Sequence, residues 1–189
     1  MSGRAVKSGL ALESQTKVHS KYDEALAGQI LLWINRVSGE DMDTSGAMDN
    51  FIAVLKDGKL LCKLANALKP ESVKKINSSA MAFKQMENIG FFLKFAEEVA
   101  GVPKPETFMT VDLYEGQDPN SVLVCLAALA RRSEKVFGVE GMGPKEAEGQ
   151  KREWTEEQLR AGEGVIGLQA GSNKGATQAG MNIGNTRHL

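Results

Sequence analysis

The sequence has few of the residues from which catalytic and metal sites are usually built. It contains two cysteines, Cys62 and Cys125, and two histidines, His19 and His188, in 189 residues. The cysteines do not stand in a C-x-x-C or other metal-ligand spacing, and the histidines lie near the two ends of the chain. We therefore expect no metal ion, no cofactor and no histidine-based catalytic triad. The cysteines are expected to be buried thiols in a reducing compartment.

The sequence also lacks excess charge of one sign and long apolar runs. Its formal net charge is −1, so no global field draws the chain to nucleic acid or to an anionic membrane. The longest apolar run, residues 122–130, is far shorter than the roughly 20 residues of a membrane span. The N-terminal segment has no apolar core of signal-peptide length, and it includes Glu13, an acid that transit peptides avoid. We predict a cytoplasmic protein that binds neither nucleic acid nor membrane.

Two basic pairs, Lys74 with Lys75 and Arg131 with Arg132, are the strongest local concentrations of positive charge before the C-terminal segment. They are too few for a nucleic-acid surface, and aromatic residues do not alternate with them. We interpret them as parts of solvated faces.

Apolar residues recur at helical spacing in four segments, which are residues 20–39, 57–70, 83–101 and 118–138. The first opens with Ser20 and Asp23 in capping-box spacing. The last opens with Asp118 as the expected N-cap and Pro119 at the first helical position. It is apolar on every side up to Arg131, which predicts the central helix of a bundle.

No segment alternates apolar and polar residues as a half-buried strand does. The Asp-Gly pair at residues 57–58 lies at the start of an expected helix and not in a hairpin. We therefore predict an all-α domain at residues 20–138, preceded by an N-terminal extension at residues 1–19.

The composition changes at residue 139. Residues 139–163 hold seven Glu and few apolar residues, which predicts an exposed acidic linker with a short helix at residues 155–160. The segment that follows, residues 164–189, contains no Asp or Glu and carries Lys174 and Arg187. We expect it to be a flexible, locally cationic tail.

Two short patterns imitate ligand sites. Gly162, Gly164 and Gly167 satisfy G-x-G-x-x-G, but no strand pattern precedes them, no helix pattern follows and no acid stands about 20 residues later. The sequence DMDTSG at residues 41–46 copies the first half of a calcium loop, yet Ile52 occupies the position of the bidentate Glu. We interpret the first as accidental and the second as a surface loop between helices.

The order of several segments resembles a known family. ILLWINRV, LKDGKLLCKLANALKP, INSSAMAFKQMENIGFFLKF and TVDLYEGQDPNSVLVCLAALAR resemble a calponin-homology domain, and VIGLQAGSNKGATQAGM at residues 165–181 resembles the calponin-like repeat. Since calponin carries several repeats and this chain carries one, the resemblance is closer to the transgelin and muscle protein 20 group. It implies a calponin-homology helical bundle and a non-enzymatic protein that binds F-actin in the cytoskeleton or in muscle.

The resemblance also implies where actin is bound. A lone domain of this type binds actin poorly and is often assigned a scaffolding or regulatory role, so the filament contact is carried over to the repeat. The residues carried over are Gly167, Leu168, Gln169, Gly171, Ser172, Asn173, Lys174, Gly175, Thr177, Gln178 and Gly180. Ala170 departs from the larger apolar residue usual in vertebrate repeats.

A glycine-rich repeat suits contact with a large surface, because its glycines adopt φ > 0 conformations and its amide side chains supply hydrogen bonds. Ordering it loses about 1 to 2 kcal/mol of backbone entropy per residue, so one repeat binds weakly and a second contact is needed for strong attachment. Ser172 and Thr177 are hypothetical phosphorylation sites, since a phosphate would cancel the local attraction to an acidic filament. The alternative, that both are only polar contact residues, stays open.

A second class of function also stays open. The chain could be a signalling or scaffold adaptor whose helical domain binds another cytoskeletal or signalling protein, with actin binding minor. The two hypotheses differ in whether the tail or the domain carries the main function.

Overall fold

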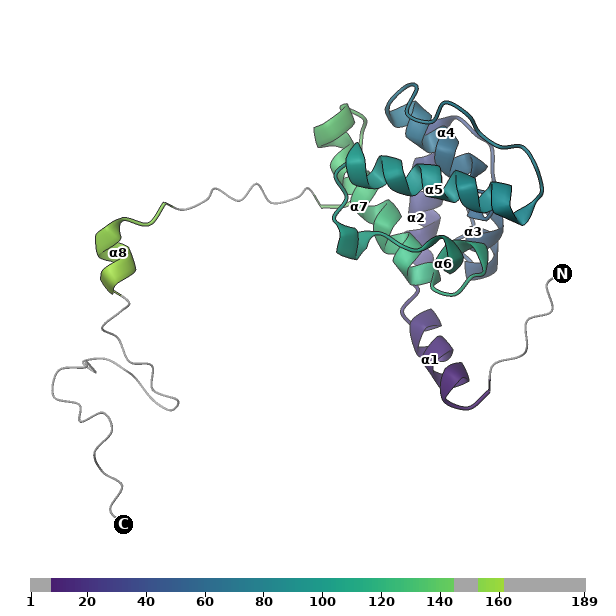
Figure 1. The fold of residues 1–189 in the computed structure, drawn as a ribbon, viewed down its shortest axis with the longest axis horizontal. Coiled ribbons are helices and arrows are strands. Elements are labelled where there is room, and N and C mark those ends of the chain that lie inside the picture. Colours follow the sequence, from purple (N-terminus) through teal and green to yellow (C-terminus); the bar gives the residue numbers. More distant parts are fainter. Residues whose placement is uncertain (1–7, 145–152, 162–189) are drawn as a thin grey trace, which may run out of the picture. The chain divides into compact units, whose positions relative to one another are not determined.

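The computed structural model describes residues 8–144 and 153–161 (Figure 1). The chain divides into two compact units, Met1–Glu146 and Ala147–Leu189. In the first unit the elements are α1 (Leu10–His19), α2 (Glu24–Ser38), α3 (Met48–Leu55), α4 (Lys59–Leu68), α5 (Ala82–Glu98), η1 (Lys104–Glu106), α6 (Thr110–Tyr114) and α7 (Pro119–Phe137). The second unit contributes α8 (Glu156–Ala161).

The secondary structure confirms the predicted all-α bundle. Every regular element in residues 8–144 and 153–161 is helical, and none is a strand. The flexible tail that we expect at residues 164–189 lies outside the described residues. None of the described helices is both long enough and apolar enough to span a bilayer.

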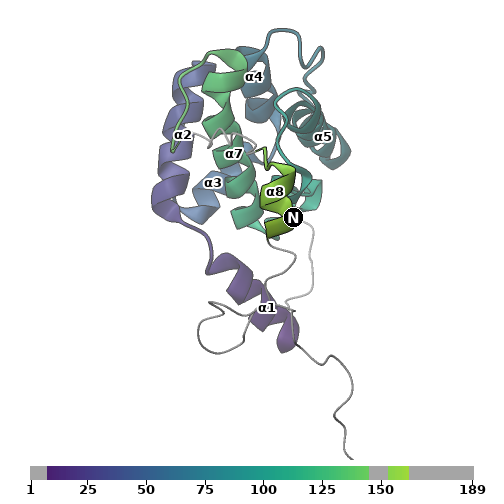
Figure 2. The ribbon, with the colours of Figure 1, turned by 90° about the vertical axis from the view of Figure 1, so that its left-hand side faces the viewer.

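The core of the bundle forms around α7. Ten of its 19 residues are buried, and Figure 2 shows it running between α2 and α5. Asp118 caps the helix by accepting the Ser121 amide proton, and Pro119 follows in the first turn, as predicted. A helix that is apolar on most sides is stable only when neighbours enclose it, so its sequence already indicated this central place.

The N-terminal end of α2 corrects one expectation. Its N-cap is Asp23, whose Oδ1 accepts hydrogen bonds from the Ala25 and Leu26 amides, and not Ser20. Ser20 instead belongs to the end of α1, where its hydroxyl donates to the Lys17 carbonyl. We did not expect α1, which buries none of its residues and so has no apolar face to predict it.

Two further helices escaped the sequence pattern because they are short. The predicted loop at residues 41–46 is present, but α3 follows it directly and buries Phe51 and Leu55. The five-residue α6 buries only Leu113. Neither helix is long enough for a 3.6-residue period to stand out from its surroundings.

Two asparagines hold the connection between α4 and α5 in place. Asn66 on α4 donates to the Val73 carbonyl (3.0 Å) and accepts the Val73 amide proton (2.8 Å). Asn88 on α5, which is fully buried, accepts the Asn77 amide proton (2.9 Å) and donates to the Asn77 carbonyl (3.0 Å). Each asparagine side chain thus donates one hydrogen bond to the backbone of the connection and accepts one from it. Residues 73–77 are held in this way at both ends.

The chain after α7 folds back onto the bundle. The Trp33 indole donates to the Glu140 carbonyl (3.0 Å), and the Met142 amide donates to the Ala130 carbonyl (3.3 Å). A Cβ atom on Gly141 would lie 2.3 Å from that carbonyl oxygen, so the close approach requires glycine. The first residues of the predicted linker, 139–142, therefore pack against the domain.

The buried pairing at Asn88 predicts a large loss of stability in Asn88→Ala. The change leaves the Asn77 amide and the Asn77 and Asp57 carbonyls without the Asn88 side chain that bonds them. Each unsatisfied buried group costs about 1–3 kcal/mol, so we expect the free energy of unfolding to fall by roughly 3 kcal/mol. Urea denaturation followed by circular dichroism measures it.

Asn35→Ala is the matched control. Asn35 also lies within a long helix, and its side chain makes no hydrogen bond to the described part of the chain. We expect its unfolding free energy to stay within about 0.5 kcal/mol of the wild type. Equal losses in the two variants would contradict the role of Asn88.

Candidate functional site

All eleven residues carried over to the filament contact, Gly167 through Gly180, lie outside the described residues. The hypothetical phosphorylation sites Ser172 and Thr177 lie there too, so both assignments stay predictions. The structure bears on one prediction about this region, that the G-x-G-x-x-G pattern is accidental. The G-x-G-x-x-G pattern begins at Gly162, directly after α8, so a helix and not a strand precedes it. A dinucleotide loop requires the strand.

The short helix predicted in the acidic segment is confirmed, one residue later than expected, as α8. Thr155 and Gln158 form a capping box: the Gln158 amide donates to the Thr155 hydroxyl (3.3 Å), and the Gln158 side chain accepts the Thr155 amide proton (3.2 Å). Two large apolar residues beside these caps, Trp154 and Leu159, are 54% and 60% exposed.

In the loop that resembles half of a calcium site, polar groups form hydrogen bonds with groups of the loop itself and of the helix that follows. Asp43 accepts the Ser45 amide proton, and the Asn50 side chain donates to the Asp43 and Ser45 carbonyls. Its glycine has a packing role, because a Cβ on Gly46 would lie 1.8 Å from the Glu24 carbonyl oxygen of α2. Nowhere in the described ranges do three or more His, Cys, Asp or Glu residues gather in a group that could hold a metal ion.

The two thiols are packing residues, as predicted. Cys62 and Cys125 are fully buried and unpaired. Burial raises the pKa of the Cys62 thiol to about 12, and Asp57 adds to the shift. Burial also raises the pKa of Cys125 to about 12, with smaller contributions from Glu106 and Glu97. The thiolate is the reactive form of cysteine, so the raised pKa values disfavour reactivity of both residues at neutral pH.

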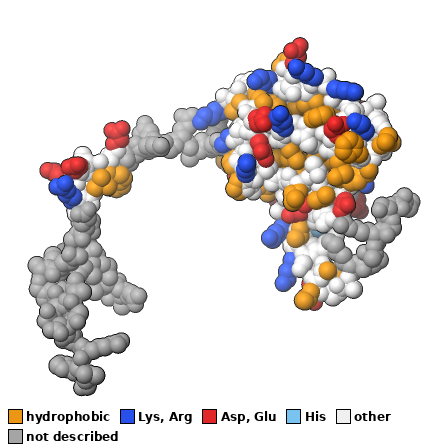
Figure 3. All heavy atoms as spheres, in the orientation of Figure 1, with side chains coloured by type: hydrophobic (Ala, Val, Ile, Leu, Met, Phe, Trp, Pro, Cys, Tyr) orange, Lys and Arg blue, Asp and Glu red, His pale blue; other side chains and the backbone are white. Residues whose placement is uncertain are grey.

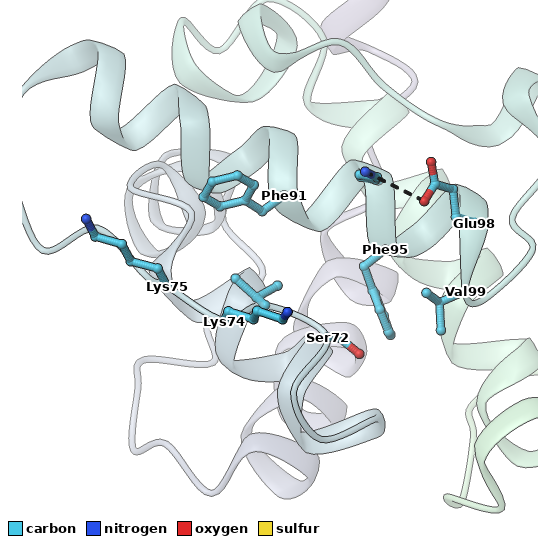
Figure 4. Close-up of a pocket in the computed structure, with 9 residues that line it drawn as sticks. Ser72, Lys74, Lys75, Phe91, Phe95, Glu98 and Val99 are labelled. Carbon is cyan, nitrogen blue, oxygen red and sulfur yellow. Dashed lines mark ion pairs between the residues drawn. The ribbon is translucent and has the colours of Figure 1, made fainter.

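A groove lies between α5 and the connection that precedes it. It has a volume of about 370 Å³, and its lining residues are Ser72, Val73, Lys74, Lys75, Phe91, Lys94, Phe95, Glu98 and Val99. In Figure 4 the labelled Phe91, Phe95 and Glu98 come from α5, Val99 is the C-cap of that helix, and Ser72, Lys74 and Lys75 come from the connection. The face over α5 also shows apolar side chains among charged ones (Figure 3). We call this feature the α5 groove.

The floor of the α5 groove is apolar. Val73 and Phe95 are 7% and 3% exposed, and Phe91 is 36% exposed. The Phe95 ring stacks on Phe137 of α7, with ring centroids 5.7 Å apart, so it is fixed from behind. An aromatic side chain that stays one-third exposed beside a fixed apolar floor offers contact area to a second molecule.

The rim of the α5 groove is basic. Lys74 and Lys75 stand on the connection and Lys94 stands on the helix, where it pairs with Glu98 at 3.9 Å. Lys74 and Lys75 are exposed, as expected for a solvated face, but the sequence did not indicate that they border a groove. The missed feature is Lys94 on the other side of the groove, which is distant along the chain and joins the pair only when the connection packs beside α5.

Two family models match the chain. The calponin homology (CH) domain matches residues 24–135, and the calponin family repeat matches residues 166–189. The first match starts with α2 and ends inside α7. The second covers almost all of the acid-free C-terminal segment.

Two relatives match over most of the chain. Myophilin from Echinococcus granulosus is 44% identical over 192 residues, which cover 100% of this chain and 99% of the relative. Muscle-specific protein 20 from Drosophila melanogaster is 45% identical over 163 residues, which cover 85% of this chain and 86% of the relative.

Solved structures share the fold. The calponin-homology domain of Rng2 from Schizosaccharomyces pombe aligns with a TM-score of 0.53, and that of an IQGAP protein from the same organism aligns with 0.54. Each is 24% identical and covers 77% of this chain and 88% of the solved chain. The described bundle is thus a calponin-homology fold, as the resemblance implied.

Burial of the thiols predicts slow labelling. At pH 8 a thiol with a pKa of about 12 is ionised to roughly one part in ten thousand, so 5,5′-dithiobis(2-nitrobenzoate) should react with native protein orders of magnitude more slowly than with protein unfolded in urea. Above the ordinary thiol pKa of 9.0, unfolded thiols lose protons that folded ones keep. The free energy of unfolding should therefore fall as the pH rises further.

The Cys62→Ala, Cys125→Ala double variant is the control for that pH dependence. Compared with the wild type, it should lose less stability between pH 9 and pH 10.5. Rapid labelling of both thiols in the native state would show that they are accessible and reactive.

Proposed function

The chain belongs to the calponin family, with one calponin-homology domain and one calponin repeat, and on this premise we propose that it binds actin filaments and stabilises or organises them. Calponin and transgelin proteins are in general actin-binding proteins of the cytoskeleton or muscle, and the relatives are non-enzymatic structural proteins. The single observation that carries the proposal is the match of the repeat to residues 166–189. We place the protein in the cytoplasm, associated with the cytoskeleton.

The repeat is the proposed filament contact. Its residues from Gly167 to Gly180 combine glycines, amide and hydroxyl side chains and Lys174, with no acid. Actin filaments are acidic, so this composition favours association through charge, while the Glu-rich segment before it opposes association. We therefore propose a contact that weakens as salt concentration rises.

A single repeat does not account for strong attachment. Ordering a glycine-rich segment loses about 1 to 2 kcal/mol of backbone entropy per residue, which offsets much of the contact energy. A second contact, from the helical domain or from another copy of the chain, would raise the effective concentration of the repeat at the filament. Bundling of filaments would also need such a second contact.

An adaptor function remains a second candidate. The observation that favours it is the α5 groove, which is an apolar depression with a basic rim on the domain and lies apart in sequence from the repeat. If the domain carries the main function, removing the repeat should leave that function intact. If the repeat carries it, removal should abolish filament binding.

Co-sedimentation with actin filaments tests the proposal. We expect the full chain to pellet with filaments at low salt, less so at physiological salt, and a chain ending at Glu163 to stay in the supernatant.

Lys174→Glu should weaken binding several-fold, because it reverses the local charge of the repeat. Lys145→Glu makes the same charge change in the acidic segment, outside the repeat, and as the matched control it should weaken binding less than Lys174→Glu does. Equal pelleting of the full and shortened chains would assign binding to the domain, and no pelleting of either would favour the adaptor.

Phosphorylation of the repeat is a separate prediction. Ser172→Asp should reduce the fraction that pellets with filaments, since a negative charge enters a segment without acid. Ser172→Asn, a neutral polar change, is the control and should bind like the wild type. Wild-type binding by Ser172→Asp would leave Ser172 as a polar contact residue only. Thr177→Asp and Thr177→Asn test the other hydroxyl in the same way.

A further inference from the structure

We propose that the α5 groove binds an acidic amphipathic peptide segment of a partner protein. The segment would place a large apolar side chain against Phe91 and Phe95, and its carboxylates would lie near Lys74, Lys75 and Lys94. The proposal concerns the helical domain and does not depend on actin binding by the repeat.

The shape of the α5 groove suits side chains of a peptide. Its volume of about 370 Å³ is at the lower end of the range for ligand pockets, which is enough for one or two large side chains. Its apolar floor combines a fixed ring, Phe95, with the partly exposed ring of Phe91. Such an arrangement provides a central apolar anchor point within a polar rim, which is the usual anatomy of a protein interface.

The wall of the groove is held rigidly before any partner binds. Residues 73–77 are fixed by the side chain of Asn66 at one end and of Asn88 at the other. Ser72 is held as well, since its hydroxyl donates to the Lys69 carbonyl (2.7 Å). A groove that is already formed loses little conformational entropy on binding, so a small contact can still give measurable affinity.

The positive charge of the groove favours an acidic peptide. Three lysines line the groove against one glutamate, Glu98, and this glutamate is paired with Lys94. Glu71 borders an adjoining depression with Lys74. Glu87 accepts a hydrogen bond from Lys84 at 2.9 Å, and this bond lowers the pKa of Glu87, with a smaller contribution from Lys75. Lys74 has no ion-pair partner among the described residues. The rim therefore keeps positive charge for a partner's carboxylates.

The chemistry favours a peptide over a free anion or a membrane. The three lysines are solvent-exposed and no buried polar side chain points into the groove as a dedicated anion ligand. The apolar contact surface is recessed between the connection and α5, whereas insertion into a bilayer needs protruding apolar side chains. A segment that brings apolar and acidic side chains together matches both the floor and the rim.

Binding of designed peptides tests the proposal on the full chain. The probes are fluorescein-labelled peptides of 12 residues. Each peptide has Phe, Leu or Trp at two positions four residues apart, with Glu on both sides, and these peptides form the Glu pool. Two further pools carry Gln or Lys in place of Glu. We expect fluorescence anisotropy to show micromolar binding of the Glu pool and weaker or no binding of the Gln and Lys pools. NMR spectra of the 15N-labelled chain should show shifts at residues 72–76 and 91–99.

Variants of the groove complete the test. Lys74→Glu with Lys94→Glu should weaken binding of the Glu pool at least about tenfold, and Phe91→Ala should weaken it similarly. Lys21→Glu reverses a lysine away from the groove and should change the affinity less than about twofold. Lys74→Gln with Lys94→Gln serves as a milder second variant, and circular dichroism confirms that each variant is folded.

Several results would overturn the proposal. The Lys pool could bind as tightly as the Glu pool, or no pool could bind at all. The NMR shifts could lie outside the α5 groove, or the groove variants could bind with the same affinity as the wild type. Binding of anionic phosphatidylserine vesicles that is lost in the lysine variants, without peptide binding, would point to a membrane instead. Co-sedimentation of the lysine variants with actin should match the wild type, so failure of this proposal and failure of filament binding can be told apart.

Discussion

One buried asparagine joins three separate segments of the bundle. Asn88 on α5 bonds the backbone of Asn77 in the connection and the Asp57 carbonyl at the start of α4. The Cys62 thiol on α4 donates to the Asn88 carbonyl, and a Cβ on Gly58 would lie 2.8 Å from the Asn88 Cβ. A fully buried polar side chain is tolerated only when it is satisfied, so these segments must meet in this one arrangement.

The α5 groove follows from that constraint. Because Asn66 and Asn88 hold the connection by its backbone, the side chains of residues 74 and 75 are left free to face solvent beside α5. The floor is set by a second contact, the stacking of Phe95 on Phe137. The helical domain thus presents a preformed surface.

Four helices with an apolar face could be predicted because their evidence is local. α2, α4, α5 and α7 show apolar periodicity, and Asp118 and Gly39 mark a start and an end through their own chemistry. The short helices α3 and α6 gain stability from the residues that they bury and not from a pattern of their own, so sequence reasoning missed them. The repeat was found by resemblance, since a contiguous motif can be read without any tertiary contact.

The sequence by itself therefore determined the helical class, the four helices with an apolar face and the two family motifs, which the comparisons with known proteins match. Only the tertiary structure decided that Asn88 is buried, that Lys94 stands across a groove from Lys74 and Lys75, and that residues 139–142 pack back on Trp33 and α7. The physical reason is the same in each case. These contacts join residues that are distant along the chain, and such contacts leave no periodicity or spacing in the local sequence.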